Sequence, residues 1–250
     1  MAQTDGAAAA RASRLALEGL LTDAPDLAAS LPPGTLDRLE RYVALLLEAN
    51  RRLNLTRVVE PSAVARLHLL DALAALPLIG EKGTGLDLGS GGGVPGIPLA
   101  LARPAMGWTL VDSVGRKADA LRAFVQALGL ANVEVLADRA EMLGQSPVHR
   151  ERYDLVVARA CAPLPVLAEL ALPLLRVGGR LVAWKGPLTK DSEEVRRGRA
   201  AIGQLGGGLL RIHSSRLSLG GHTLVEVPKE LTTPARYPRR PGEPARRPLG

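Results

Sequence analysis

A glycine-rich segment, residues 89–93 (GSGGG), directly follows the short apolar run at residues 85–88. Glycines at such a turn let the backbone bend tightly and approach a ligand that a Cβ atom would hold away. In open α/β sheets, ligands bind at the carboxyl ends of the strands, where this turn is expected. The segment therefore predicts a site for a nucleotide-type cofactor.

The glycine segment fits two cofactor patterns. Gly91-x-Gly93-x-x-Gly96 satisfies the dinucleotide pattern, which would indicate an NAD(P)-dependent oxidoreductase. Asp87, two residues before Gly89, instead gives the D-x-G-x-G-x-G arrangement of enzymes that use S-adenosylmethionine. The glycines begin one residue after Leu88, which favours the second pattern; a glycine turn without a ligand is the third interpretation.

Polar residues follow three more predicted strands. Asp112 ends the second strand, where a carboxylate can accept the hydroxyls of an adenosine ribose or simply begin a turn. Residues 138–141 follow the third strand and would border an adenine, and residues 159–162 follow the fourth. Polar groups at successive strand ends predict one cofactor pocket.

These groups must be positioned by strands that alternate with helices, a pattern typical of an α/β fold with a parallel sheet covered on both faces. We expect strands over residues 85–88, 108–112, 133–136, 153–158 and 180–184, and helices over 95–101, 116–128, 163–175 and 191–205. Two further strands, near 209–217 and 222–227, follow each other directly and predict an antiparallel edge.

The first 80 residues predict a helical extension. Residues 1–30 are rich in alanine and indicate a helix, and Thr35 can cap a second helix that stops near Asn50. Residues 51–57 are expected to form a loop, and Pro61 to begin a helix that reaches about residue 75. We therefore expect a helical extension at residues 1–80, the sheet domain at 81–228 and a tail at 229–250.

Composition limits the class of protein. The chain has 250 residues, 46% of them hydrophobic, and a single cysteine, Cys161, which excludes an internal disulfide and a cysteine-based metal site; we expect no metal. No apolar run approaches the ~20 residues of a membrane span, and the N-terminus does not resemble a signal peptide, so we expect a cytoplasmic monomer without a membrane partner. The net charge of +7 suits an anionic partner such as nucleic acid, although an arginine-rich composition alone would also give it.

The tail at residues 229–250 carries six basic and two acidic residues and five prolines. This composition predicts an extended, poorly packed basic segment. The alternative is an ordered strap in which Tyr237 and its prolines pack back onto the edge of the sheet.

The sequence resembles the bacterial family of ribosomal RNA small subunit methyltransferase G, also called glucose-inhibited division protein B. The matching motifs lie between about residue 50 and the C-terminus: Asn54-Leu55-Thr56, His68-Leu69-Leu70-Asp71, LDLGSGGGVPGIPLAL, Asp112-Ser113, Arg139-Ala140-Glu141, Arg159-Ala160, Trp184-Lys185-Gly186 and TPARYPRRPGEPARRPL. The resemblance implies a Rossmann-like class I methyltransferase fold with a seven-stranded, mostly parallel sheet. It also implies S-adenosylmethionine-dependent methylation of guanine N7 in 16S ribosomal RNA, free or in the small ribosomal subunit.

Residue by residue, the resemblance implies cofactor contacts at Gly89, Val94, Asp112, Ser113, Ala140, Glu141 and Arg159, to which the glycine pattern adds Asp87, Gly91 and Gly93. For contacts to RNA we expect Asn54, His68, Lys185, Arg236, Arg239 and Arg240. Asn54 could instead cap the next segment, and His68 could pair with Asp71. The pair Arg116-Lys117 departs from the family pattern, in which the basic residue varies.

Methyl transfer is an in-line displacement that depends on positioning, and guanine N7 offers a lone pair, so no general base is required. Arg159 and Arg139 are the candidate catalytic residues, because a guanidinium suits a carboxylate, a phosphate or the guanine O6 edge; both could also be ordinary surface arginines. Cys161 would be needed only for addition to a cytosine ring. An oxidoreductase and a non-catalytic ribosome assembly factor remain the alternative functions.

Overall fold

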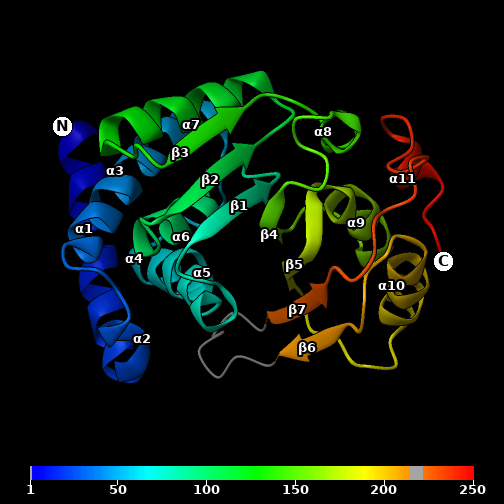
Figure 1. Cartoon of the computed structure of the whole chain (residues 1–250). Coiled ribbons are helices and arrows are strands. Elements are labelled where there is room, and N and C mark those ends of the chain that lie inside the picture. The colour runs from blue at the N-terminus through cyan, green and yellow to red at the C-terminus, as the bar shows by residue number, and fades with distance from the viewer. Residues whose placement is uncertain (1, 214–221) are drawn as a thin grey trace.

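The computed structural model describes residues 2–213 and 222–250, and within them a seven-stranded sheet lies between two layers of helices (Figure 1). The strands are β1 (Gly83–Leu88), β2 (Met106–Val111), β3 (Val133–Leu136), β4 (Tyr153–Arg159), β5 (Leu175–Lys185), β6 (Arg211–His213) and β7 (Thr223–Pro228), in the order β3-β2-β1-β4-β5-β7-β6. The first five are parallel, and β7 runs antiparallel to both β5 and β6. The predicted α/β fold and its antiparallel edge are confirmed; residues 214–217 of the strand expected near 209–217 lie outside the described part.

Each sheet face has its own core, because side chains alternate along every strand. Leu155 and Val157 of β4 join one cluster, and Val156 and Ala158 join the other. The first cluster is covered by α1 (Ala2–Thr22), α3 (Thr35–Leu53), α6 (Gly96–Ala102) and α7 (Gly115–Leu128); the second is covered by α8 (Ala140–Gln145), α9 (Leu164–Ala171) and α10 (Glu193–Gln204). Among the described helices, none is long and apolar enough to cross a membrane.

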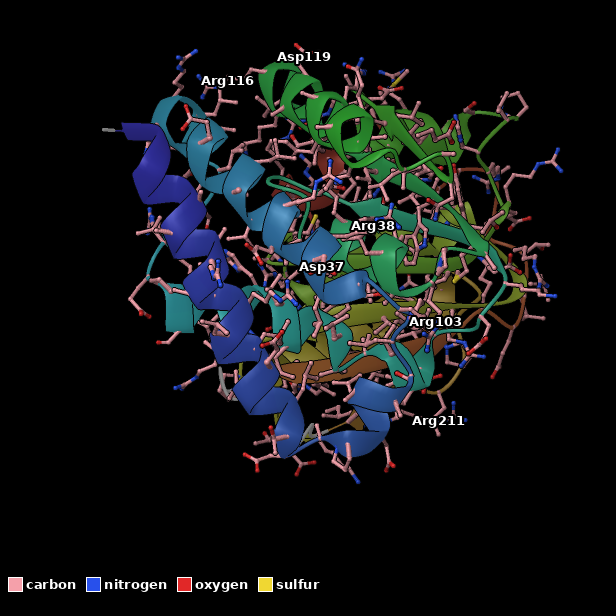
Figure 2. All side chains as sticks on the ribbon, turned by 90° about the vertical axis from the view of Figure 1, so that its left-hand side faces the viewer. Asp37, Arg38, Arg103, Arg116, Asp119 and Arg211 are labelled. Atoms are coloured by element: carbon pink, nitrogen blue, oxygen red, sulfur yellow. The ribbon has the colours of Figure 1, made fainter. Side chains whose placement is uncertain are left out.

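The N-terminal helices pack on the sheet side that α7 covers, as Figure 2 shows for α1 and α3. Arg38 of α3 donates a hydrogen bond to the Leu128 carbonyl at the end of α7 (3.2 Å). The short α2 (Pro25–Ala29) lies between α1 and α3 in sequence. Gly34, with φ +77°, occupies the N-cap position in place of Thr35, so that expectation is wrong. The helix α3 extends to Leu53, three residues into the segment expected to form a loop, and residues 54–57 form the loop as predicted.

The helix predicted from Pro61 is present, but its middle is wider than an α-helix. It consists of α4 (Pro61–Val64), a π-helical turn η1 (Ala65–Leu70) and α5 (Asp71–Leu73), followed by the 3₁₀ turn η2 (Leu76–Leu78). Such turns are rare and often occur at functional sites. On the other side of the sheet, the 3₁₀ turn η3 (Leu172–Leu174) follows α9, and β5 begins at Leu175, five residues earlier than predicted.

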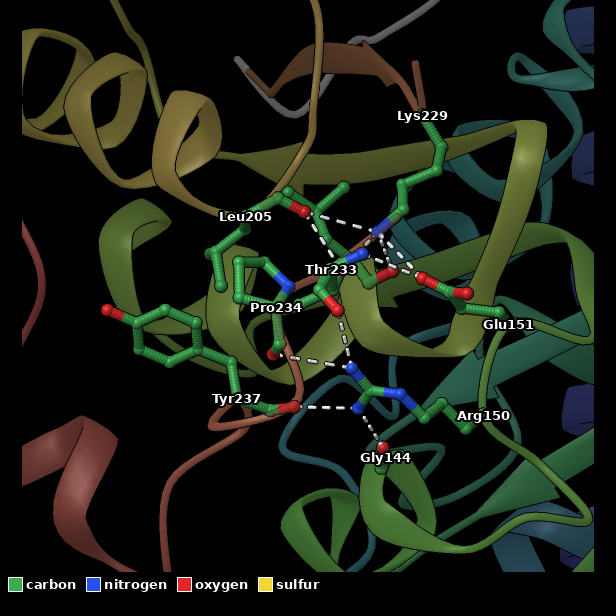
Figure 3. Close-up of polar contacts among 9 residues, drawn as sticks. Gly144, Arg150, Glu151, Leu205, Lys229, Thr233, Pro234 and Tyr237 are labelled. Carbon is green, nitrogen blue, oxygen red and sulfur yellow. Dashed lines mark hydrogen bonds and ion pairs between the residues drawn. The ribbon is translucent and has the colours of Figure 1, made fainter. Parts of the chain in front are cut away.

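The prediction that residues 229–250 pack poorly is wrong. This segment, called the strap below, crosses α8 and α9 and ends in the short helix α11 (Glu243–Arg246) (Figure 1). Lys229 and Tyr237 are buried, and the Lys229 ammonium donates to the carbonyls of Leu172 (2.9 Å) and Leu205 (3.1 Å) and to the Thr233 hydroxyl (Figure 3). Burial lowers the pKa of Lys229 to about 8.

A second anchor holds the strap beside the first. The Arg150 guanidinium donates to the carbonyls of Gly144, Thr233 and Tyr237, each at 2.7 Å (Figure 3). The two partners in the strap, Thr233 and Tyr237, lie more than 80 residues from Arg150 in sequence. The composition of the strap alone therefore could not reveal these contacts. The strap is ordered by long-range contacts to backbone carbonyls.

Candidate active site

The glycine loop between β1 and α6 is held in place by backbone contacts. The amides of Gly89 and Ser90 both donate to the Val111 carbonyl at the end of β2 (2.9 Å each). Gly89, Gly91 and Gly93 have φ angles of +75°, +57° and +95°, which L-residues with a Cβ rarely adopt. The loop therefore needs glycine at the positions that the sequence pattern marks.

One tyrosine and one aspartate side chain support the loop from within the protein. The Tyr42 hydroxyl of α3 donates to the Gly92 carbonyl (2.7 Å). Asp87 is fully buried, and its Oδ2 accepts the Gly96 amide (3.0 Å), while its Oδ1 has no partner among the described residues. Burial raises the pKa of Asp87 to about 7, even though the Gly96 amide favours the charged form.

Asp112 lies at the end of β2 and also holds the glycine loop. Its Oδ2 accepts the Gly91 amide and its Oδ1 accepts the Val114 amide, each at 2.9 Å. Each carboxylate oxygen has a second lone pair, so these bonds still allow Asp112 to accept hydroxyl groups from a ligand. The turn role and the ligand role of Asp112, which the sequence presented as alternatives, are therefore compatible.

The first cavity, of about 270 Å³, lies across the carboxyl ends of the parallel strands. The sequence placed Gly89, Ser113, Arg139, Ala140 and Glu141 in a cofactor pocket, and the structure brings them together in its lining. Three strap residues complete the lining, Gly242, Pro244 and Ala245, and no sequence pattern predicted them. Asp87, Asp112 and the loop residue Gly93 do not line the first cavity; the two aspartates hold the loop in place.

Glu141 connects the first cavity to the strap. Its Oε1 accepts from the Gly242 amide (2.8 Å) and from Arg139 Nη2 (3.1 Å). Burial opposes ionisation of the carboxyl, but these two donors outweigh it and hold the pKa of Glu141 below its usual range. Arg139 itself is half exposed and lies at this end of the site, away from Arg159.

The second cavity, of about 290 Å³, lies on the other side of the glycine loop and is lined by Gly91, Val94 and Arg159 together with Thr56, His68 and Lys117. Arg159 Nη2 approaches His68 Nδ1 at 3.1 Å, while Arg159 Nη1 donates to the Leu67 carbonyl and lies 3.5 Å from Asp71 Oδ2. The π-helical turn thus holds the arginine that ends β4. Thr56, like Lys117, was not among the predicted site residues.

The His68 imidazole is neutral, with an acceptor at Nδ1 and a donor at Nε2. A guanidinium only donates, so His68 Nδ1 must accept from Arg159, and the proton must lie on Nε2, which is 2.8 Å from the Thr56 hydroxyl. Burial and the charge of Arg159 lower the pKa of His68 to about 4. His68 therefore forms its hydrogen bonds with Arg159 and Thr56, and Asp71, the alternative partner, acts on His68 through its charge.

Asp71 is buried and organises a third cavity, of about 440 Å³, beside the second. Its Oδ2 lies 3.0 Å from His222 Nδ1, and its carbonyl accepts from Trp184 Nε1 (2.9 Å). His68, Arg159, Trp184, Lys185 and His222 line this cavity. The ends of β4, β5 and β7 therefore share one polar cluster with the π-helical turn.

The structure separates the candidate RNA contacts. Asn54 is exposed and adopts the left-handed conformation that ends α3, so it is the C-cap of the preceding helix and not a cap of the next segment. Lys185 lies 2.6 Å from Glu194 and donates to the Ala162 carbonyl (2.9 Å), so it ties the end of β5 to α10 and to the loop before α9. Arg239 forms an ion pair with the fully buried Glu169, so its guanidinium is held within the protein, and its contact with RNA stays a prediction. Arg236 and Arg240 are exposed.

Cys161 lies at the wall of the first cavity. Although the residue is exposed overall, desolvation of its side chain and the nearby carboxylates of Asp87 and Asp112 raise the pKa of the thiol to about 11. A thiol with this pKa is a poor nucleophile at neutral pH. This agrees with the interpretation that Cys161 has no covalent role.

Comparisons with known proteins identify the family of this chain. A family model described as rRNA small subunit methyltransferase G matches residues 35–217. A protein from Deinococcus radiodurans named ribosomal RNA small subunit methyltransferase G is 46% identical over 237 residues, which cover 93% of this chain and 92% of that protein. The chain belongs to the ribosomal RNA small subunit methyltransferase G family. A protein of that name from Symbiobacterium thermophilum is 41% identical over 94% of this chain and 98% of its own length.

Solved structures show the same fold. A structure assigned to the S-adenosyl-L-methionine-dependent methyltransferases, from Methanococcus maripaludis, has a TM-score of 0.51 at 16% identity, covering 66% of this chain and 86% of its own. This likeness shows the class I methyltransferase fold, and the family assignment makes the protein a methyltransferase that uses S-adenosylmethionine, as the sequence predicted. The comparisons support neither the oxidoreductase nor the assembly factor.

The residues present fit S-adenosylmethionine. The loop glycines leave backbone where a side chain would intrude: a Cβ on Gly89 would lie 3.3 Å from Cys161 Sγ at the wall of the first cavity. Asp112 retains acceptor capacity for hydroxyl groups, and the two cavities lie on either side of the loop that it holds. An elongated ligand with an adenosine end and a charged amino acid end suits this arrangement.

Proposed function

We propose that this methyltransferase transfers the methyl group of S-adenosylmethionine to N7 of a guanine in 16S ribosomal RNA. The family assignment supports the small-subunit RNA as substrate, since relatives across most of the chain carry that name. The lining of the second cavity is the observation that favours N7 as the methylated atom. Of its described residues, the ionisable ones are His68, Lys117 and Arg159, so no carboxylate lies there to remove a proton.

N7 chemistry needs no proton removal, because guanine N7 attacks with a lone pair. When bound, S-adenosylmethionine supplies a methyl group on a positively charged sulfur. His68 cannot act as an efficient base here, because its Nδ1 accepts from Arg159 and its pKa is about 4. The protein contributes orientation, which is the main requirement of an in-line displacement.

Arg159 is placed to orient the guanine. Its contacts to Leu67, His68 and Asp71 use three of its five N–H groups. The remaining N–H groups can donate to guanine O6 or to the carboxylate of the cofactor, as a guanidinium suits both. His68 and Thr56 then act as positioning residues, because they hold the arginine and do not themselves need to touch substrate.

The cofactor is placed with its adenosine end in the first cavity and its amino acid end toward the glycine loop. Ser113, Ala140 and Glu141 contact the adenosine, and Asp112 accepts the ribose hydroxyls with its free lone pairs. Gly89, Gly91, Val94 and Arg159 lie toward the amino acid end. Arg139, at the adenosine end, belongs to cofactor binding and not to the transfer step.

RNA contacts are assigned to exposed cations beside these cavities. Arg236 and Arg240 line a fourth cavity together with Glu141, so they lie next to the cofactor site and not in an isolated tail. Each phosphate contact makes the negative slope of log affinity against log salt steeper by about 0.7 for single-stranded RNA. Arg236→Ala and Arg240→Ala should each flatten that slope without changing cofactor affinity.

The function is tested by transferring a radiolabelled methyl group from S-adenosylmethionine to small-subunit RNA from cells that lack this enzyme. The wild type should label the RNA, Arg159→Met should lose most of the rate, and Arg196→Met should keep it. Arg196 is a suitable control because it is exposed on α10 and pairs with Glu193 of the same helix. Equal rates for the two arginine variants would contradict the assigned role of Arg159.

A further inference from the structure

The cofactor site includes a wall that comes from the strap. Gly242, Pro244 and Ala245 line the first cavity together with Val111 at the end of β2 and Ala140 at the start of α8. The family model ends at residue 217, so the strap lies outside the region that this model describes. Pro244 is buried although it lies six residues from the C-terminus, which indicates that the wall is packed.

Two contacts fix this wall at the cavity. Arg239 binds Glu169 of α9 through Nε (2.8 Å) and Nη2 (2.5 Å) and also donates its backbone amide to Glu169 (2.9 Å). Three residues later, the Gly242 amide donates to Glu141 Oε1 (2.8 Å). The strap is therefore tied to both helices, α8 and α9, that border the first cavity.

The chemistry of the wall suits a flat heterocycle. Leu88, Val111, Val166 and Leu170 give the cavity an apolar surface, and Pro244 adds an apolar ring on the strap side. Asp138, Arg139 and Glu141, which follow β3, add polar groups to the lining. An adenine ring needs apolar contact on its faces and polar partners at its edge.

We propose that the strap is part of the cofactor site: Gly242, Pro244 and Ala245 cover the adenine of S-adenosylmethionine, and the Arg239–Glu169 ion pair is the positioning element that holds them there. This inference rests on the proposed placement of the adenosine end in the first cavity. It gives the C-terminus a function in cofactor binding that is separate from RNA capture. By thermodynamic reciprocity, bound cofactor must also hold the strap in place.

Two truncations test the proposal by calorimetry with S-adenosylhomocysteine and with 5′-methylthioadenosine, which keeps the adenosine end alone. A chain ending at residue 241 lacks the wall. A matched chain ending at residue 247 keeps the wall and loses the contact of the Gly250 carbonyl with Arg197 and the packing of Leu249. The first truncation should weaken both ligands by the same factor, about tenfold or more. The second should bind both as the wild type does.

Three outcomes separate the possibilities. Wild-type affinity in the chain ending at residue 241 would overturn the proposal, as would a loss confined to S-adenosylhomocysteine, because the strap would then act at the amino acid end. Failure of the wild type to bind either ligand would instead overturn the placement of the cofactor.

If the chain ending at residue 241 does not fold, the full-length protein provides the test. Trypsin can cleave after Arg246, which is exposed at the end of α11. Saturating S-adenosylhomocysteine should slow that cleavage severalfold in the wild type and much less in Pro244→Gly. Cleavage at the same rate with and without ligand would overturn the proposal.

Discussion

The ion pair between Arg239 and Glu169 makes the ordered strap testable through stability. Glu169 is completely buried on α9, and Arg239 is the partner that neutralises its carboxylate, with two side-chain hydrogen bonds and one from its amide. Arg239→Met removes the guanidinium but keeps the amide and a side chain of similar length. The carboxylate then remains buried with only the amide and whatever water can reach it.

The expected loss follows from the cost of an uncompensated buried charge. Breaking a buried ion pair by removing one partner costs about 3–5 kcal/mol. The Arg239 side chain is 19% exposed, so water can partly reach the site, and we expect about 3 kcal/mol, the lower end of that range. Arg240→Met is the matched control, because Arg240 is exposed on the same strap and should change stability by about 0.5 kcal/mol or less.

Urea unfolding followed by the fluorescence of Trp108 and Trp184 measures both variants, since these buried tryptophans report on the sheet. Replacing both partners, Glu169→Leu with Arg239→Met, should recover most of the loss, because no charge is then buried. If Arg239→Met were no less stable than Arg240→Met, the ion pair would not order the strap. The original expectation of a loose basic tail would then be restored.

Three further predictions concern the site. Between pH 6.5 and pH 4, the free energy of unfolding should fall by up to about 3 kcal/mol more in the wild type than in His68→Gln. The reason is that His68 binds a proton near pH 6.5 in the unfolded chain and only near pH 4 in the folded protein. Parallel pH profiles of the two proteins in urea titrations would contradict this. Cys161→Ala should keep most of the methyl transfer rate, and a variant that binds cofactor but is inactive would indicate covalent catalysis. Tyr42→Phe removes the hydrogen bond to Gly92 and should cost about 1 kcal/mol of stability and weaken S-adenosylhomocysteine severalfold; calorimetry with unchanged affinity would show that the loop does not need this support.

The sheet and the cofactor loop could be predicted because their signals are local. Apolar runs such as residues 153–158 between polar turns indicate buried strands, and parallel strands bring their carboxyl ends to one edge of a sheet. Ser113, Ala140 and Glu141 could therefore be placed in one pocket without any contact information. The end of α3 was also accessible in principle, because Asn54 is a residue that often adopts the left-handed C-cap conformation.

The strap and the π-helical turn could not be predicted, because their partners are distant in sequence. Five prolines and six cations indicate disorder when read alone, and only the carbonyls around Lys229 and the carboxylate of Glu169 show why this segment folds. In the same way, nothing near His68 in sequence reveals Arg159, which lies 91 residues away. The residues that we propose to orient the reaction could therefore be predicted as site candidates, but their partners could not.

The chemical position of the methyl group tests the central claim most directly. Small-subunit RNA methylated by the wild type is treated with borohydride and then aniline, which cleave the chain at N7-methylguanine, and the break is mapped by primer extension. One break at a guanine, present only when enzyme and S-adenosylmethionine are both supplied, is the predicted result. Stable incorporation of the labelled methyl group without such a break would contradict N7 methylation and the assignment of the second cavity as a site that works without a base.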